Sequence, residues 1–262
     1  MLDYSVAVCI RKGVKVGFCF LLKEGLSHSL LWEQFLLSAS PDSYGLYVHA
    51  KTPIPSPVLP GSRIDPSPLP TAWGDRSLVE ATQRLFLMAV EDDCDAMVLV
   101  SGDMLPLQPF GWIQDFCRMT RCSVQPLFGL NERQISANAK RFELISPYLQ
   151  LPIEKLRKQN MFFVMTREDF CRINQHANPA VFPLQSLSDE YYWVNHLIRL
   201  EAQWLPSKVI FCNPDPTRTQ ALAMDLTPEL LASSRADGYG FIRKVISIDD
   251  QAVVDLRSVY AS

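Results

Sequence analysis

Two adjacent carboxylates, Asp189 and Glu190, precede an aromatic run in the segment SLSDEYYWVNHL (residues 186–197). A carboxylate beside apolar rings is poorly hydrated, which raises its pKa and lets it accept a proton from a hydroxyl group. The same residues would also suit a helix N-terminus, because Ser188 can cap it and acidic residues favour the first turn. The pattern therefore predicts either a general base or a helix start whose aromatic side chains pack against the core.

Basic residues near the C-terminus form a second candidate group. Arg218 lies in NPDPTRTQ, and Arg243 and Lys244 are adjacent in GFIRKV. Guanidinium and ammonium groups form charge-assisted hydrogen bonds with phosphate, which arginine can make in a bidentate manner. Each residue alone would suit an ordinary exposed position. Three in one region favour a site for a diphosphate group.

Motifs of several other enzyme classes are missing. The chain has no complete GxGxxG, Walker P-loop, GxSxG or HExxH motif, which argues against a Rossmann dehydrogenase and the common hydrolases. Its D-x-D triplet, at 93–95, precedes a predicted strand, and we interpret it as a turn instead of a metal–diphosphate site. We expect no metal site and no resident cofactor.

Composition limits the class of partner. The formal net charge is -3 and the pI is near 5.8, so the chain has no general attraction for nucleic acid or an anionic membrane. The seven cysteines form no CxxC pair and are expected to be reduced. The longest apolar stretch, VGFCFLLKEGL, contains two charged residues and is too short to span a bilayer. We expect a cytoplasmic enzyme of a microbial or viral type.

The first half of the chain alternates strand and helix patterns. These segments, beginning with a strand, are 15–22, 28–39, 43–50, 76–92, 95–103 and 109–120. Their order predicts an α/β fold with a mostly parallel central sheet flanked by helices. Ligands of such sheets gather at the carboxyl ends of the strands. The polar residues Lys23–Glu24, His49–Lys51 and Ser101–Asp103 should therefore border a binding cleft.

The second half is less regular. Strands are predicted at 160–166 and 208–214, and helices at 167–175, 189–200 and within 227–247. In the first half, the proline-rich segment 52–70 predicts an extended surface loop, which is either a spacer or a rim of the cleft.

Sequence blocks along most of the chain resemble the core-2/I-branching enzyme family, which includes branching β-1,6-N-acetylglucosaminyltransferases, peptide xylosyltransferases and plant relatives. The segment AWGDRSLVEATQRL is similar to the family's tryptophan-led helix and begins at Trp73. The segment LRKQNMFFVMTRE is similar to the family block WRKGSQWFxxxRE, with Arg157, Lys158 and Glu168 in register. MVLVSGDMLPL resembles a family strand and its following turn, SDEYYW resembles the P-D-E motif, and FIRKV resembles a block near the family's C-terminus.

The resemblance implies a single GT-A-type domain, with a nucleotide-binding half at about 1–125 and an acceptor-side, catalytic half at about 126–262. It also implies inverting transfer from a UDP-sugar to a glycan or glycoprotein hydroxyl, without an obligatory metal. Glu190 matches the family's general base, and Lys244, Arg218 and the neighbouring Arg243 match its diphosphate-binding region. Supporting residues on the acceptor side would be Asp189, Arg157, Lys158, Glu168, Trp73 and Asp103.

The chain departs from the family pattern at several positions. The aspartate that follows the second strand in the animal enzymes is replaced near Ala50, and Leu156, Gln159 and Phe162 replace residues of the WRKGSQW block. The donor sugar therefore stays open among GlcNAc, xylose and glucuronate types. Two alternatives also stay open: a non-catalytic sugar-nucleotide or glycan-binding module on the same fold, and a scaffold protein that uses the 52–70 loop.

Overall fold

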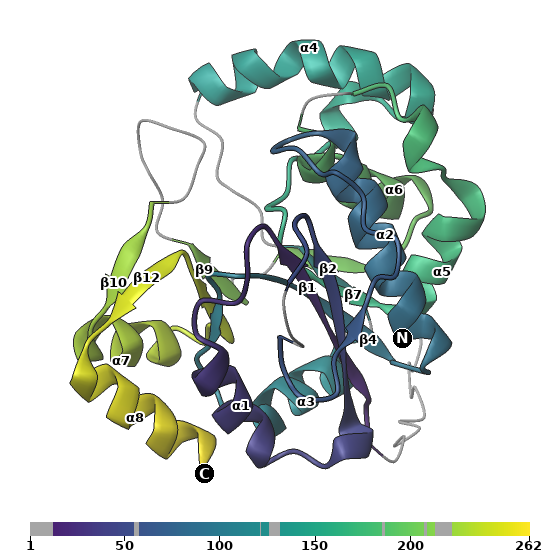
Figure 1. Cartoon of the computed structure of the whole chain (residues 1–262). Helices are drawn as coiled ribbons and strands as arrows, with labels where there is room; N and C mark the ends of the chain where they lie inside the picture. The colour runs from purple at the N-terminus through teal and green to yellow at the C-terminus, as the bar shows by residue number, and fades with distance from the viewer. Residues whose placement is uncertain are drawn as a thin grey trace, which may run out of the picture.

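A computed structural model describes residues 13–54, 58–120, 122–125, 132–184, 187–206, 209–212 and 222–262. Within them, seven strands form the main sheet, in the order β3-β2-β1-β4-β7-β6-β8. Their bounds are β1 Val16–Leu22, β2 Tyr44–Ala50, β3 Arg63–Ile64, β4 Ala96–Ser101, β6 Ser123–Gln125, β7 Val164–Thr166 and β8 Trp204–Pro206. Neighbouring strands are parallel except at β7, which is antiparallel to β4 and β6. The predicted α/β class and mostly parallel sheet are confirmed, and the arrangement is consistent with a GT-A-type fold (Figure 1).

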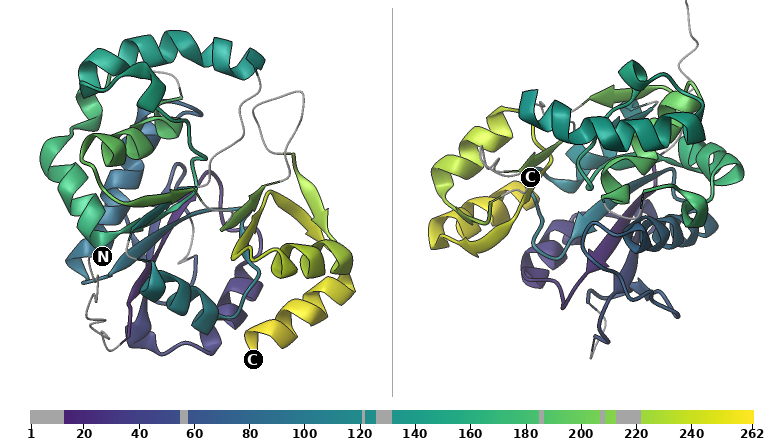
Figure 2. Two further views of the ribbon diagram at one scale, coloured as in Figure 1. Left: turned by 180° about the vertical axis from the view of Figure 1, so that it is seen from behind. Right: turned by 90° about the horizontal axis from the view of Figure 1, so that it is seen from above.

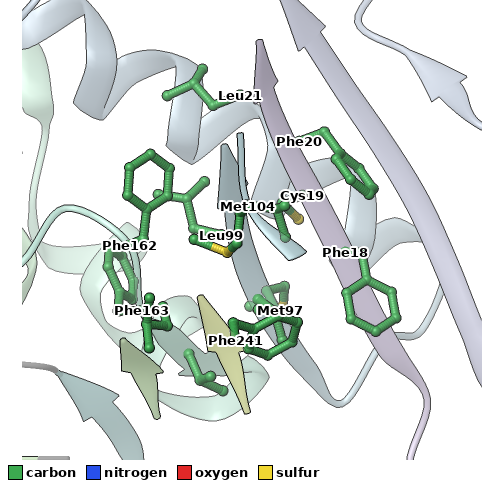
Figure 3. Packing of buried hydrophobic residues seen from close by; sticks show 14 of the residues in the cluster. Phe18, Cys19, Phe20, Leu21, Met97, Leu99, Met104, Phe162, Phe163 and Phe241 are labelled. Atoms are coloured by element: carbon green, nitrogen blue, oxygen red, sulfur yellow. The ribbon is translucent and has the colours of Figure 1, made fainter. Parts of the chain in front are cut away.

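Helices cover both faces of the sheet because the central strand is apolar on both sides. All seven residues of β1 are buried. Phe18 and Phe20 pack edge-on against Trp32 of α1 (Ser29–Leu37). Between them, the Cys19 thiol approaches the Leu85 carbonyl of α2 (Arg76–Glu91) on the opposite face. Figure 3 shows this alternation along β1, as the two-residue period of a strand requires.

The second half contributes helices above and beside this sheet. They are α4 Glu132–Leu149, α5 Arg167–His176 and α6 Tyr192–Arg199, with short 3-10 turns at η2 Ile153–Lys155, η3 Pro179–Val181 and η4 Ser188–Glu190. In the first half, α3 spans Phe110–Met119 and the 3-10 turn η1 spans Pro41–Ser43. The strand predicted at 160–166 is shorter than expected, since only its last three residues are extended and paired.

The prediction of a helix at 189–200 is wrong at its N-terminal end. Ser188, Asp189 and Glu190 form the separate turn η4, and α6 begins only at Tyr192. The Ser188 hydroxyl donates to the Leu184 carbonyl instead of capping a helix. The two carboxylates therefore lie in a turn of their own, and the aromatic residues that follow are buried in the core as predicted.

A C-terminal unit packs beside the main sheet (Figure 2). Its elements are β5 Leu105–Pro106, β9 Ile210–Cys212, β10 Met224–Leu226, α7 Pro228–Ala236, β11 Phe241–Arg243, β12 Val245–Ile248 and α8 Asp250–Tyr260. Strand β11 pairs with β9 and, in antiparallel fashion, with β5. Since β5 follows β4 closely in the chain, this pairing brings Arg243 and Lys244 to the carboxyl end of β4.

Two residues in left-handed conformations join η4 to the loop before α2. Gly74 has φ +67° and Leu187 has φ +60°, and the Leu187 amide donates to the Gly74 carbonyl. A Cβ atom on Gly74 would lie 3.1 Å from Leu187 Cδ2. The turn that carries Glu190 and the loop that carries Trp73 are therefore held as one unit.

We expect Gly74→Ala to lower the free energy of unfolding, measured by urea denaturation, more than Gly238→Ala does. Both glycines have positive φ, but a Cβ at Gly238 would meet no atom within 4 Å. Gly238→Ala should cost about 1–2 kcal/mol of backbone strain alone. Gly74→Ala should cost roughly 1 kcal/mol more because Leu187 must shift. Equal losses would show that Leu187 does not constrain this loop.

Candidate functional site

A cavity of about 310 Å³, which we call the main cavity because Glu190 lines it, opens at the carboxyl edge of the sheet. Its walls come from the ends of β1 and β2, the loop before α2, the segment before β7, turn η4 and the end of β11. The lining residues are Leu21, Leu22, Lys23, Lys51, Thr71, Ala72, Trp73, Leu78, Asn160, Met161, Phe162, Leu187, Asp189, Glu190, Arg243 and Lys244. Leu21 and Phe162 connect this cavity to the packed core that Figure 3 shows.

A second hollow, which we call the side cavity, continues along the same edge with a volume of about 540 Å³. It shares Leu21 and Lys23 with the main cavity and is also lined by Glu24, Ser101 and Asp103. The expectation that polar residues after the strands border a cleft is confirmed for these positions and for Lys51. His49 is an exception, because its ring is buried and accepts a hydrogen bond from the Leu69 amide at 2.9 Å.

The Glu190 carboxylate is paired with a buried lysine. Lys158 Nζ lies 2.9 Å from Glu190 Oε2, and the two side chains are only 3% and 14% exposed. Burial raises the pKa of Glu190, whereas the Lys158 ammonium opposes that rise. Among the described residues Oε2 has no hydrogen bond of good geometry, so the contact with Lys158 is an ion pair. Lys158 thus holds the carboxylate from one side, and Glu190 also lines the main cavity.

Buried amide side chains fix the backbone that carries Lys158. The backbone N–H of Gln159 donates to the Glu190 carbonyl at 2.9 Å. The side-chain oxygen Oε1 of Gln159 accepts from the backbone N–H of Val194 at 2.7 Å. Asn195 of α6 accepts from the Arg157 amide and donates to the Arg157 carbonyl, both at 2.8 Å. These bonds on either side of residue 158 tie its segment to η4 and α6.

Asp189 is a second buried acid at the cavity wall. Its side chain is 7% exposed, and its Oδ1 atom has no hydrogen-bond partner among the described residues. Burial, and to a lesser degree the neighbouring Glu190 charge, raise the pKa of Asp189 to about 7. Two adjacent carboxylates in a poorly hydrated place do not ionise together readily. Since only Glu190 has a lysine partner, we assign the negative charge to Glu190 near neutral pH.

Four cations also line the main cavity and differ in how they are paired. Lys23 lies 2.6 Å from Glu24. Arg243 lies over the Phe162 ring at 4.2 Å, and its Nε atom is 3.8 Å from Asp103. Within the described part of the chain, Lys51 and Lys244 have no carboxylate partner. These two lysines are therefore available to an anionic ligand.

Backbone hydrogen bonds hold Lys244 at the cavity. Its carbonyl accepts from the Met224 amide at 2.9 Å, and the next amide, that of Val245, donates to the Asp103 carbonyl at 2.9 Å. The 224–226 strand and the turn after β4 thus fix the residue from two sides. Lys51 is fixed by its own amide, which donates to the Leu22 carbonyl at 2.9 Å.

The structure brings together most of the residues singled out from sequence. Glu190, Asp189, Lys244, Arg243 and Trp73 all line the main cavity. Trp73 is 71% exposed and lies at its rim. Lys158 lies directly behind Glu190, and Asp103 lines the side cavity. Arg218 lies outside the described residues.

Two of the expected supporting residues do not reach the cavity. Arg157 is exposed, and its guanidinium donates to the Glu154 and Leu156 carbonyls. Glu168 is exposed in the first turn of α5. Because β7 runs antiparallel to β4, the start of α5 lies at the amino end of β4, where the Arg167 amide donates to the Asp95 carbonyl at 2.9 Å. Glu168 is therefore at the opposite edge of the sheet, together with the 93–95 turn.

Among the described residues, no group of three or more His, Cys, Asp or Glu side chains is arranged to hold a metal ion. The described cysteines are free thiols. None of the described helices combines the length and apolar character needed to cross a membrane.

The sequence is weakly similar to that of a glycosyltransferase, a relationship with which the fold is consistent. The chain is 23% identical to glycosyltransferase BC10 of rice, Oryza sativa subsp. japonica, over 164 residues. The match covers 59% of this chain and 39% of the rice protein, so it spans well under half of that protein's length. No protein-family model matches the chain.

The raised pKa of Asp189 predicts that stability depends on pH. Its pKa of about 7 in the folded protein lies above the usual 3.8. Between about pH 4 and about pH 7 the folded protein therefore binds a proton at Asp189 that the unfolded chain has lost. The unfolding free energy should therefore fall as pH rises from about 4 to about 7, with a contribution from Asp189 on the order of 2–4 kcal/mol. Asp189→Asn should flatten this part of the curve, measured by urea unfolding at a series of pH values.

The control for this experiment is Asp42→Asn, which removes an exposed carboxyl group in η1. It should keep the slope of the parent protein. If Asp189→Asn also keeps that slope, Asp189 does not carry the proton assigned to it.

Proposed function

We propose that this chain is an inverting glycosyltransferase that moves a sugar from a UDP-sugar to a hydroxyl group of a glycan or glycoprotein, with Glu190 as the general base. One observation carries the proposal: the Glu190 carboxylate lines the same cavity, at the carboxyl edge of the sheet, as two lysines that have no carboxylate partner among the described residues. A carboxylate supplies a base for the acceptor, and cations supply a site for the leaving group.

In this mechanism, Glu190 Oε1 accepts the proton of the acceptor hydroxyl as that oxygen attacks C1 of the donor sugar. The new C1–O bond forms on the face opposite the bond to UDP, which breaks with its electron pair on the diphosphate. Configuration at C1 is thereby inverted. The protonated Glu190 then returns its proton to solvent.

Side chains would stabilise the departing diphosphate. Lys51 and Lys244 carry two positive charges with no carboxylate partner among the described residues, which matches the two negative charges of a diphosphate ester. Arg243 is positioned by Phe162 and Asp103 to add a further donor. Prepositioned cations are worth most where water is excluded. We therefore propose that transfer needs no obligatory metal, and that Arg218 assists if it reaches the same cavity.

The similarity to a rice glycosyltransferase supports sugar transfer as the general activity. The motifs around Trp73, Lys158, Glu190 and Lys244 support the finer proposal that the chain is related to the core-2/I-branching enzymes. We extend this to a donor of the UDP-GlcNAc, UDP-xylose or UDP-glucuronate type. The exposed ring of Trp73 at the cavity rim suits contact with an acceptor sugar.

Glu190→Gln should reduce the turnover number for sugar transfer by roughly 10²–10⁴-fold, because the amide cannot accept the acceptor proton. Donor screening with UDP-GlcNAc, UDP-xylose and UDP-glucuronate would identify the productive pair for this assay. Binding of UDP, measured by calorimetry, should stay close to that of the parent protein. Turnover near the parent rate would remove Glu190 from the mechanism.

Lys51→Ala and Lys244→Ala should each weaken UDP binding by about 10- to 100-fold, since each removes a charge-assisted hydrogen bond to phosphate. The measurement is calorimetric titration with UDP in the presence of EDTA, so that affinity reflects the side chains. Lys155→Ala, at an exposed position in η2, is the matched control and should bind UDP normally. An unchanged affinity in both cavity variants would contradict the proposed diphosphate site.

One observation favours a second candidate, a non-catalytic sugar-nucleotide-binding module. The Lys158–Glu190 ion pair lowers the basicity that burial gives the carboxylate. Such a module would be stabilised by UDP compounds in a thermal-shift assay but would neither hydrolyse nor transfer the donor sugar. Hydrolysis of the donor that Glu190→Gln slows would instead favour the enzyme.

A further inference from the structure

We propose that Lys158 is the positioning residue of Glu190: it keeps the carboxylate ionised in a poorly hydrated place and turns its Oε1 atom toward the main cavity. This inference rests on the proposed function, because it gives Lys158 a part in the same proton transfer. It goes beyond the expectation drawn from sequence, which placed Lys158 among the supporting residues on the acceptor side.

The geometry separates the two oxygens of Glu190. Oε2 lies 2.9 Å from Lys158 Nζ, and the lysine side chain is 3% exposed, so the ammonium is not free to reach a ligand. Oε1 is the oxygen farther from Lys158, and Glu190 lines the main cavity. Because a carboxylate is planar, holding one oxygen fixes where the other points. Lys158 thus acts through Glu190 and need not touch the substrate.

The surroundings of the pair show that the lysine is held for this contact. Hydrogen bonds from Gln159 and Asn195 fix the backbone on both sides of Lys158. Burying an ion pair is unfavourable compared with packing apolar side chains of similar size. Stability alone is therefore a weak reason for a lysine at this position, whereas a requirement for an ionised glutamate is a sufficient one.

Other charged groups also act on Glu190. Asp189 lies beside it in η4, and Arg141 of α4 opposes the rise in its pKa more weakly than Lys158 does. Arg243 and Lys244 line the same cavity. Lys158 forms an ion pair with the Glu190 carboxylate at 2.9 Å and, of these cations, opposes the rise in its pKa most strongly. Removing its charge should therefore change the ionisation of Glu190 more than any other single substitution.

The test replaces Lys158 by Met, which keeps an unbranched side chain and removes the charge. Lys158→Met should raise the titration midpoint of the Glu190 side-chain carboxyl by about one to two pH units, followed by carbon-13 NMR of the labelled protein. The rate of sugar transfer at neutral pH should fall roughly 10- to 100-fold and recover partly as pH is raised. The KM for the UDP-sugar should stay within about twofold, which a general distortion of the cavity would not allow.

Two further variants separate positioning from structural support. Lys155→Met removes an exposed lysine of the same segment and should change neither the titration nor the pH profile. The double variant Lys158→Met/Glu190→Gln removes both charges and should recover most of the thermal stability that Lys158→Met loses. If Lys158→Met does not fold but the double variant does, that result establishes that the charges of Lys158 and Glu190 stabilise each other. If neither folds, Lys158 is structural and the inference is wrong.

The inference and the proposed function can fail separately. An unchanged Glu190 midpoint in Lys158→Met would overturn the inference even in an active enzyme. A second outcome is that Lys158→Met raises the Glu190 midpoint although the parent protein transfers no sugar. In that case the ion pair is established as a property of the site, but both the positioning role and the enzymatic function are rejected. A raised midpoint with a shifted pH profile of transfer would support both.

Discussion

A carboxylate next to an aromatic core must either lose its charge or acquire a partner, and this constraint explains the arrangement around Glu190. Tyr191, Tyr192 and Trp193 follow it directly and are buried. Desolvation makes the carboxylate more basic but favours its neutral form, which cannot act as a base. The Lys158 ammonium opposes neutralisation while burial still raises the pKa. The amide bonds of Gln159 and Asn195 follow from this requirement, since a buried lysine must be held accurately to offset its own desolvation.

Strand direction decides which segments can contribute to such a site. The parallel strands β1, β2 and β4 end at one edge of the sheet, and the loops after them supply Lys23, Lys51 and Asp103. The antiparallel strand β7 reverses this relation. Residues before it, including Phe162, lie at the cavity edge, whereas α5 begins at the other edge. One antiparallel strand thus lets a segment from late in the chain reach the ends of the early strands.

The early elements were predictable because their patterns are local. An apolar run such as 15–22 and an amphipathic run such as 76–92 determine a buried strand and a surface helix with little help from the rest of the chain. The separate turn η4 before α6 was not predictable in this way. Leu187 takes a left-handed conformation there, and the Ser188 hydroxyl donates to the Leu184 carbonyl. Helix α4 was not predicted at all. The Glu190–Lys158 contact was also missed, since 32 positions separate the residues in the sequence and their burial depends on tertiary packing; the only signal was the shared family block around Lys158.

In the proposed mechanism one cavity needs both a base and phosphate-binding cations, and unlike charges in one cavity tend to pair with each other. Lys23 and Glu24 do so at the entrance. Glu190 does not need a cavity cation, since Lys158 satisfies its charge from behind, and apolar side chains such as Leu78 and Leu187 line the same cavity. Lys51 and Lys244 therefore keep positive charge that no carboxylate of the described residues neutralises. On this view the buried ion pair serves the phosphate site as much as the base: without Lys158, the glutamate would compete with the diphosphate for the same cations.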